Sequence, residues 1–192
     1  MGIRLKAGTR IGAYRITAYL AGGGEGDVYE AVSGGGRRVV LKQHGFSISD
    51  PDKGTEVERV RRVKRLAGKS CPYVCEILDV FEYDDLLYVA MEYVEGESLD
   101  SMVSRKGRLT PAEVAPIAHD VLEGLSWLHS LDLVHRDIKP ASIIAGKSAA
   151  KIIDVDIAFH ATLSRLTHRA VGPCTYAYAP VEVFRGKDDS ID

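Results

Sequence analysis

The first hundred residues alternate apolar and polar positions in short runs, which are separated by clusters of glycine or aspartate. A period of two is typical of strands that bury one face, so this part of the chain is predicted to form a sheet. The predicted strands are residues 13–21, 27–32, 39–42, 74–83 and 86–94. Glycines at 22–26 and 34–36 predict tight turns between the first three strands.

One segment in this part of the chain has a helical period instead. In residues 54–68, Val57, Val60 and Ala67 fall on one helical face, charged residues occupy the other positions, and glycine stands at both ends. An apolar stripe between two glycines predicts a single amphipathic helix.

After residue 96 the pattern changes to a long helix, predicted over residues 109–131. Thr110 is a good N-cap, Pro111 suits the first helical position, and Glu113 completes a capping box. The expected apolar stripe consists of Val114, Ile117, Ala118, Val121, Leu122, Leu125 and Leu128. If the remainder of the core is incomplete, part of this stripe is expected to be exposed.

Two short strands, residues 141–145 and 151–155, are predicted after this helix, and the rest of the chain reads as irregular and polar. The chain therefore divides into a strand-rich part (about 12–93), a short hinge (94–97) and a helix-led part (98–192). Ligands favour the crevice between two such parts.

The composition is that of an ordinary soluble globular protein. Of the 192 residues, 45% are hydrophobic and 27% are charged, and the net charge is −2. This balance favours neither a nucleic-acid partner nor a membrane surface, and it carries no signal for an oligomeric state. The sparse cysteines, Cys71, Cys75 and Cys174, predict reduced thiols in the cytoplasm.

Five features suit phosphoryl transfer. The glycines of residues 20–32 permit close approach of backbone N–H groups to a phosphate, and Lys42 follows in an apolar strand. Asp137 is able to orient a hydroxyl group, and Lys139 is able to neutralise a transferred phosphoryl group. Asp154 ends an apolar strand, where a carboxylate is unusual for packing but suitable for Mg²⁺.

In this order the features resemble the eukaryotic-like (Hanks-type) serine/threonine protein kinases. "LAGGGEGDVYEA" is similar to the glycine-rich loop, "VVLK" to the strand of the ATP-binding lysine, "HRDIKPAS" to the catalytic loop and "DVD" to the metal-binding motif. The resemblance covers nearly the whole chain. It implies an α+β, bilobal protein-kinase fold with a strand-rich N-lobe that contains one helix and a helical C-lobe that is incomplete.

The family's functional roles carry over to the matching positions. The resemblance implies that Asp137 is the catalytic base, assisted by Lys139, while His135 is structural. Asp154 and Ser142 would hold Mg²⁺. ATP would be bound by Leu20, Ala21, Gly22, Gly23, Gly24, Glu25, Gly26, Asp27, Val28, Lys42, Glu56, Glu92 and Val94.

Within that set, Glu56 would hold Lys42 in an ion pair, with Glu58 as the second choice. Met91 is similar to the gatekeeper residue, and the backbone groups of Glu92 and Val94 would bind adenine. The cofactors implied are ATP and Mg²⁺.

Substrate class and regulation follow from the same resemblance. Lys139 and the proline after it are similar to the serine/threonine branch, which implies a protein substrate phosphorylated on Ser or Thr. Arg136 would bind a phosphate in the activation segment. The candidate phosphorylation sites are Thr162, Ser164 and Thr167.

The chain departs from the family at positions that bear on activity. Ser142 stands where the family has the Mg²⁺-binding Asn, and Val155 and Asp156 replace the Phe and Gly of the metal motif. Pro173 replaces the threonine of the segment 172–182, which puts peptide docking in doubt.

The first hypothesis is therefore an ATP-dependent serine/threonine kinase, of which this chain is a fragment with low activity alone. The alternative is a pseudokinase that acts as a nucleotide-binding scaffold or regulatory module. A kinase of a small molecule is a third reading.

Overall fold

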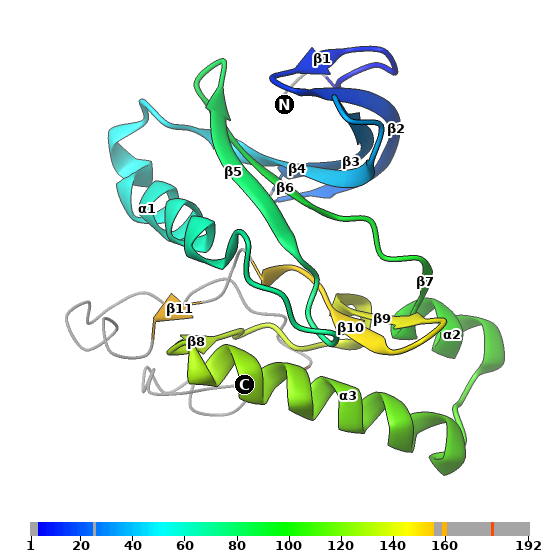
Figure 1. The fold of residues 1–192 in the computed structure, drawn as a ribbon. Helices are drawn as coiled ribbons and strands as arrows, with labels where there is room; N and C mark the ends of the chain where they lie inside the picture. The colour runs from blue at the N-terminus through cyan, green and yellow to red at the C-terminus, as the bar shows by residue number, and fades with distance from the viewer. Residues whose placement is uncertain (1–3, 25, 156–158, 161–177, 179–192) are drawn as a thin grey trace. The chain divides into compact units, whose positions relative to one another are not determined.

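The structure is a computed structural model, and it describes residues 4–24, 26–155, 159–160 and 178 (Figure 1). The chain separates into two compact units. The first comprises residues 1–70 and 76–93, and the second comprises residues 71–75 and 94–192.

The first unit is a six-stranded antiparallel sheet with the strand order β1-β2-β3-β4-β6-β5. Its strands are β1 (Arg10–Ile11), β2 (Tyr14–Gly23), β3 (Gly26–Ser33), β4 (Arg38–Ser47), β5 (Ile77–Tyr83) and β6 (Leu86–Glu92). All five predicted strands are present, but β4 is longer than expected and β5 begins at Ile77, three residues later than predicted. Strands β2 and β3 curve strongly, and two register shifts in their pairing account for the bend (Figure 1).

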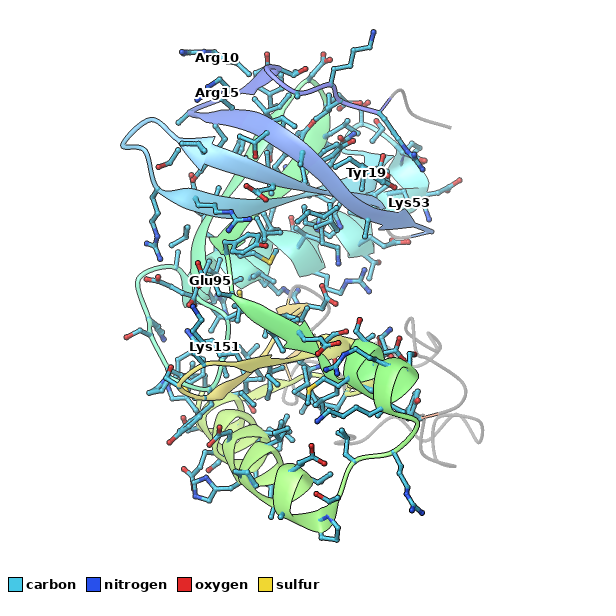
Figure 2. All side chains as sticks on the ribbon, turned by 90° about the vertical axis from the view of Figure 1, so that its right-hand side faces the viewer. Arg10, Arg15, Tyr19, Lys53, Glu95 and Lys151 are labelled. Carbon is cyan, nitrogen blue, oxygen red and sulfur yellow. The ribbon has the colours of Figure 1, made fainter. Side chains whose placement is uncertain are left out.

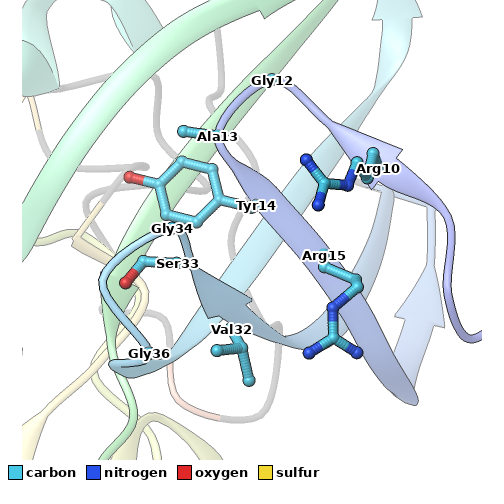
Figure 3. A pocket seen from close by; sticks show the side chains of 9 residues that line it. All are labelled: Arg10, Gly12, Ala13, Tyr14, Arg15, Val32, Ser33, Gly34 and Gly36. Carbon is cyan, nitrogen blue, oxygen red and sulfur yellow. The ribbon is translucent and has the colours of Figure 1, made fainter.

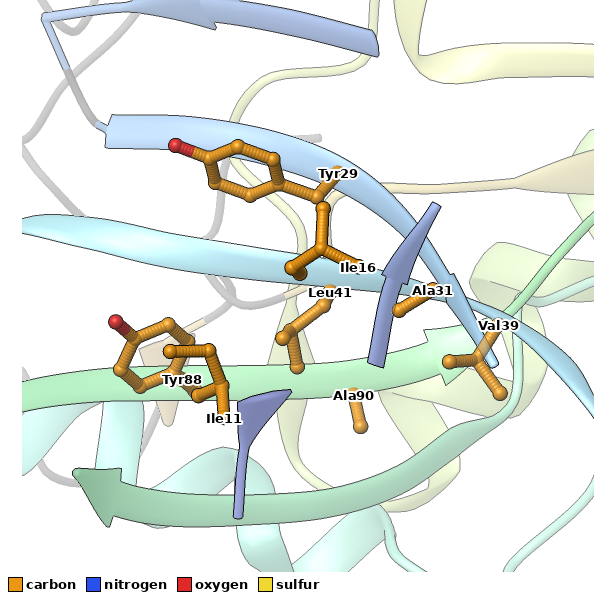
Figure 4. Packing of buried hydrophobic residues seen from close by; sticks show 8 residues of the cluster. All are labelled: Ile11, Ile16, Tyr29, Ala31, Val39, Leu41, Tyr88 and Ala90. Atoms are coloured by element: carbon orange, nitrogen blue, oxygen red, sulfur yellow. The ribbon is translucent and has the colours of Figure 1, made fainter. Parts of the chain in front are cut away.

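Alternation along the strands builds the core of this sheet. Residues two apart point to the same face, so pairs from β3, β4 and β6 meet on one side of the sheet (Figure 4). The buried cluster consists of Ile11, Ile16, Tyr29, Ala31, Val39, Leu41, Tyr88 and Ala90. Burial of this apolar area is the main force that stabilises the sheet.

The predicted helix of the first unit is confirmed as α1 (Gly54–Val63), which buries Val57, Val60 and Val63. Short 3₁₀ turns, Pro51–Lys53 and Lys64–Leu66, precede and follow it. Asp50 caps the first of these turns, because its side chain accepts a hydrogen bond from the backbone N–H of Asp52 at 3.0 Å. Helix α1 ends at Val63, five residues before the end of the helix that the sequence predicted.

The second unit combines two helices with short strands. Its elements are β7 (Gly96–Ser98), α2 (Leu99–Lys106), α3 (Pro111–Ser130), β8 (Leu133–Val134), a 3₁₀ turn (Pro140–Ser142), β9 (Ile143–Gly146), β10 (Ala150–Ile152) and β11 (Phe159–His160). Strands β10, β9 and β7 form one antiparallel sheet, and β11 pairs with β8. The two strands predicted here are present as β9 and β10, but β10 ends at Ile152, so Asp154 follows the strand and does not belong to it.

Helix α2 was not predicted from the sequence. Ser98 caps it by accepting a hydrogen bond from the Ser101 N–H at 3.2 Å, and Gly107 ends it with a φ of +79°. No residue of α2 is buried, so its apolar stripe is too weak for a period to be recognised. The Ser cap and the terminal glycine were the available signals.

A segment from the middle of the chain belongs to the second unit. The Cys75 N–H donates to the Ile152 carbonyl at 2.8 Å, and the Ile152 N–H donates to the Tyr73 carbonyl at 2.8 Å. Helix α3 packs tightly here, because a Cβ atom on Gly124 would lie 3.0 Å from the Tyr73 carbonyl oxygen. Cys71 and Cys75, the two cysteines among the described residues, form no disulfide bond.

Helix α3 has the predicted capping box, in which Thr110 and Glu113 exchange hydrogen bonds. Of its apolar stripe, Val121 and Leu128 are buried, whereas Leu122 is 66% exposed and Val114 is 41% exposed. The stripe is therefore partly uncovered, as the sequence analysis anticipated. No helix in the described part of the chain has both the length and the apolar character needed to cross a membrane.

The capping box leads to a pH-dependent prediction. Contact with Lys106, followed by hydrogen bonds from Thr110, lowers the pKa of Glu113 from 4.5 to about 2. A carboxyl group with a depressed folded-state pKa contributes stability above its unfolded pKa, and that contribution disappears as the pH falls through the folded value. Urea unfolding from pH 5 to pH 2 should show the wild type losing its advantage over Glu113→Gln between about pH 4.5 and 2. A constant difference between the two proteins would contradict this assignment.

Candidate active site

In the first unit, the glycine-rich stretch forms the hairpin end between β2 and β3. Gly22 lies opposite Asp27 and Gly23 lies opposite Gly26 in the antiparallel register. Gly26 has a φ of +137°, and a Cβ atom there would lie 1.9 Å from the Gln43 carbonyl oxygen. Only glycine fits this position, because a side chain would collide with the neighbouring strand β4.

The Asp27 carboxylate stabilises the same hairpin through hydrogen bonds with two tyrosines. The Tyr19 hydroxyl donates to Asp27 Oδ1 and the Tyr29 hydroxyl donates to Asp27 Oδ2, both at 3.4 Å. The Leu5 N–H donates to the Tyr29 oxygen at 3.2 Å, which ties the N-terminal segment to this group. A Cβ atom on Gly22 would lie 2.2 Å from Asp27 Oδ1, so the bracket also requires glycine there. Asp27 was predicted to bind ATP, and its hydrogen bonds with the two tyrosines were not predicted.

The two kinds of glycine in the hairpin give a matched pair of variants. Gly26→Ala should destabilise the chain by roughly 1–3 kcal/mol, the cost of a strained backbone that other contacts enforce. Gly24→Ala is the control, because a Cβ atom on Gly24 meets nothing within 4 Å. Thermal or urea unfolding should separate the two variants clearly. Equal effects of both substitutions would show that the clash with Gln43 does not occur.

Lys42 lies in β4, opposite Val28 on β3 and Val89 on β6. Its side chain is only 4% exposed. Burial of an ammonium group is costly unless it has polar or charged partners, so this position is unusual for a lysine with a purely structural role. The local cause is the alternation of β4, which places Val39 and Leu41 on the core face and Lys42 on the other.

Glu56 lies in the first turn of α1, and its carboxylate contacts the Lys53 side chain. The Lys53 ammonium nitrogen is 3.0 Å from Glu56 Oε1. This hydrogen bond is the largest cause that lowers the pKa of the Glu56 carboxyl group. The spacing of three residues between Lys53 and Glu56 is visible in the sequence, but Lys42 alone was predicted as the partner of Glu56.

The end of β6 presents the residues expected to bind adenine. Met91 is 5% exposed, and Glu92 follows it. The Glu92 N–H donates to the Glu76 carbonyl at 2.9 Å, and the Glu92 carboxylate accepts from the Glu76 N–H at 3.2 Å. Glu92 is therefore firmly held, and its N–H is already used within the first unit. Val94 belongs to the second unit.

In the second unit, His135 organises the catalytic-loop sequence and is completely buried. The Asp137 N–H donates to His135 Nδ1 at 3.3 Å, and His135 Nε2 lies 2.9 Å from the Ile153 carbonyl oxygen. Because Nδ1 accepts a hydrogen bond, the ring proton must be on Nε2, which then donates to Ile153. His135 thus joins the loop to Ile153 through both ring nitrogens, which is the structural role expected from the sequence.

Asp137 and Lys139 lie on the same side of the loop and form an ion pair through Oδ2 and Nζ. The Asp137 side chain is 9% exposed and that of Lys139 is 26% exposed. Arg136, between His135 and Asp137, has a φ of +71°, an unusual backbone conformation for an arginine. This turn separates the buried His135 from the two charged groups.

Ser142 is completely buried, and its hydroxyl group is bonded to the loop backbone. Its oxygen lies 3.2 Å from the Asp137 carbonyl and 2.9 Å from the Lys139 carbonyl, and it accepts from the Lys139 N–H at 3.0 Å. The hydroxyl therefore closes the loop on itself. Sequence analysis did not identify this role, since a loop-closing hydrogen bond leaves no periodic signal.

Asp154 is held next to this loop through the residue before it. The Ile153 N–H donates to the Ser142 carbonyl at 2.8 Å, while the Ile153 carbonyl accepts from His135. Both backbone groups of Ile153 are thus bonded to the loop that carries Asp137. Asp154 itself has a φ of +62°, and Val155 after it is 1% exposed.

The donor set suits a cation shared with a ligand better than a cation held by protein alone. Among the described residues, no group of three or more His, Cys, Asp or Glu side chains gathers to hold a metal ion. Mg²⁺ is usually held by one or two carboxylates together with water and phosphate oxygens. Asp154, which follows β10 and is held beside the loop through the backbone of Ile153, fits that mode.

Several predicted residues cannot be placed. Glu25 of the glycine-rich stretch and Asp156 after Val155 lie outside the described residues, as do Cys174 and Pro173. The same is true of the predicted regulatory sites Thr162, Ser164 and Thr167.

The first unit is a twisted sheet with a glycine hairpin and a buried lysine. The second unit has a His-Arg-Asp loop beside an aspartate that follows a strand. Together these features define a protein kinase fold. Residues 14–191 match the protein kinase domain family. The chain belongs to this family.

Its relatives are bacterial serine/threonine kinases. Serine/threonine-protein kinase PknE from Mycobacterium bovis is 35% identical over 183 residues, which are 93% of this chain and 32% of PknE. Probable serine/threonine-protein kinase PkwA from Thermomonospora curvata is 32% identical over 178 residues, 90% of this chain and 23% of PkwA. The chain thus spans a third or less of the length of these two relatives.

Solved structures agree with this assignment. The crystal structure of the PknI kinase domain from Mycobacterium tuberculosis matches with a TM-score of 0.70 and 26% identity. The match covers 80% of this chain and 62% of that domain. The α+β kinase fold predicted from the sequence is confirmed.

Proposed function

We propose that the chain carries the nucleotide-binding and catalytic-loop residues of an ATP-dependent serine/threonine protein kinase. The observation that carries this proposal is the bonding of Ile153 to both ends of the loop. It keeps Asp154 and the Asp137–Lys139 pair in one small region of the second unit. A base and a metal carboxylate beside each other are what phosphoryl transfer requires.

When bound, ATP and Mg²⁺ would supply the phosphoryl group and neutralise its charge. Asp154 would hold the cation, and Lys42 and the backbone of the glycine hairpin would hold the phosphates. Glu56 would orient Lys42 after exchanging Lys53 for it, and the Glu92 carbonyl and the Val94 backbone would bind adenine. These roles rest on the family resemblance together with the positions described above.

Asp137 would accept a hydrogen bond from a protein Ser or Thr hydroxyl and orient it for attack. Lys139, already paired with Asp137, would place a positive charge beside the transferred group. Arg136 would bind a phosphorylated residue among Thr162, Ser164 and Thr167. The low cysteine content of the sequence supports a cytoplasmic location.

A pseudokinase remains the second candidate because of Ser142. Its hydroxyl is buried and bonded to backbone carbonyls, so it is a poorer Mg²⁺ ligand than an amide at the same position. In this reading the chain binds nucleotide and acts as a scaffold or regulatory module.

Phosphate transfer from labelled ATP to a mixture of Ser/Thr peptides tests the proposal. We expect a low rate for this chain alone, a rise with Ser142→Asn, and a loss of about a hundredfold or more with Asp137→Asn. A matched control is Asp52→Asn, which removes an exposed carboxylate. Transfer that is unchanged by Asp137→Asn would contradict the proposed role of this residue. Nucleotide binding without transfer in every variant would favour the pseudokinase.

A further inference from the structure

A pocket in the first unit shares no residue with the candidate active site. It is bounded by the β1–β2 hairpin and by the turn between β3 and β4, and its volume is about 260 Å³ (Figure 3). The side chains that matter for its chemistry are Arg10, Arg15, Tyr14, Ser33 and Val32. They come from three neighbouring strands at the β1 edge of the sheet.

Two arginines face each other across this edge. Arg10 on β1 is the direct cross-strand partner of Arg15 on β2, so both side chains leave the same face of the hairpin (Figure 2). Within the described part of the chain, neither arginine has a hydrogen bond or an ion pair. Like charges directly opposite each other in a sheet are destabilising, so this pair costs stability while nothing neutralises it.

Neighbouring arginines show the usual solution. Arg38 forms two 2.8 Å hydrogen bonds with Glu30, and its guanidinium group lies over the Tyr93 ring at 3.6 Å. Arg37 is 2.8 Å from Glu76. The two arginines of the pocket thus differ from those beside them in having no carboxylate of this chain.

The remaining walls are held in place and offer further contacts. Ser33 Oγ already accepts a hydrogen bond from the Arg37 N–H at 3.2 Å, which leaves its own proton to donate. The Tyr14 ring stacks on Phe81 with its centroid at 5.5 Å. Burial raises the pKa of the Tyr14 hydroxyl, so that group stays protonated. Val32, opposite Arg15 in the register, supplies an apolar surface for a methyl group or chain carbon.

We propose that this pocket binds a phosphomonoester, namely the phosphorylated side chain of a phosphoserine or phosphothreonine peptide. Two planar guanidinium groups match the several acceptor oxygens and the near-double negative charge of such a group. A single carboxylate carries one negative charge and would neutralise only one of the two arginines. The choice of a phosphorylated peptide as the ligand rests on the proposed function, because the product of that function is phosphorylated Ser or Thr. The binding of a phosphate group by the two arginines does not depend on it.

The test is peptide binding to the full chain without nucleotide, so its outcome does not depend on phosphoryl transfer. The probe is a short fluorescent peptide with one phosphothreonine, and the unphosphorylated peptide and inorganic phosphate are compared with it. Arg10→Gln and Arg15→Gln should each weaken binding about tenfold, the typical loss of a charge-assisted hydrogen bond. Arg10→Lys and Arg15→Lys keep the charge and should lose less.

Arg108→Gln is the matched control, because Arg108 is also exposed and has no ion pair among the described residues but lies outside the pocket. Its binding should equal that of the wild type. The proposal is overturned if the phosphopeptide fails to bind at millimolar concentration, or if Arg108→Gln weakens binding as much as the pocket variants do. It is also overturned if inorganic phosphate binds as tightly as the phosphopeptide, since the site then selects an ion and not a peptide.

Discussion

Asp154→Asn should abolish the Mg²⁺-dependent part of ATP binding by this chain and leave the folded state intact. The substitution keeps the shape of the side chain and removes the carboxylate charge that a hard cation requires. Loss of outer-shell partners alone weakens metal sites by about 10–100-fold, so loss of the carboxylate itself should weaken ATP binding in Mg²⁺ by at least about tenfold. Calorimetric titration with ATP, with and without Mg²⁺, measures this directly.

Asp52→Asn is again the appropriate control, because it removes one negative charge from an exposed position on the 3₁₀ turn before α1. Its titration should match that of the wild type. If Asp154→Asn binds ATP with the same Mg²⁺ dependence as the wild type, Asp154 does not hold the cation, and the assignment of the metal site is wrong.

The largest effect on stability is expected for His135→Ala. The substitution removes a completely buried ring and leaves two groups without their partner, the Asp137 N–H and the Ile153 carbonyl. Buried groups without a hydrogen-bond partner are costly, so we expect a loss of about 3 kcal/mol in the free energy of unfolding. Urea unfolding followed by circular dichroism is the suitable measurement.

His119→Ala provides the comparison, since its side chain is 66% exposed on α3. It should change the free energy of unfolding by less than about 0.5 kcal/mol. A small effect of His135→Ala, similar to that of His119→Ala, would mean that the loop and the strand before Asp154 are not joined through this ring.

The elements that the sequence predicted well are those with strong local patterns. Strands β2 and β3 alternate apolar and polar positions, β6 is a continuous apolar run, and α3 begins with a proline and a complete capping box. Residues Lys42, Asp137 and Asp154 were found because they stand as charges in apolar surroundings. Such a charge is costly to bury, and it stands out without any knowledge of the fold.

Contacts between distant segments could not be predicted in the same way. The bonds of Tyr73 and Cys75 to Ile152 join positions nearly eighty residues apart, and no periodicity in either segment records them. The loop-closing hydroxyl of Ser142 and the bracing carboxylate of Asp27 belong to the same class. Side-chain hydrogen bonds of this kind depend on the final packing, not on the spacing of residue types.

The pairing of Glu56 with Lys53 shows a different limit. A spacing of three residues on or beside a helix permits an ion pair, and this one was not considered beside the more distant Lys42. In the proposed function, Glu56 exchanges one lysine for the other.

The central claim is that one chain binds Mg²⁺ and ATP together through Lys42 and Asp154. The most direct measurement is the melting temperature of the unmodified chain, of Lys42→Met and of Asp154→Asn, each with millimolar ATP in the presence and absence of Mg²⁺. A ligand that binds only the folded state at a hundred times its dissociation constant stabilises it by about 2.7 kcal/mol. We predict a clear rise for the unmodified chain that is larger with Mg²⁺, and a loss of the Mg²⁺-dependent part in both variants. No rise with ATP in any condition, or the same rise in all three proteins, would contradict the account.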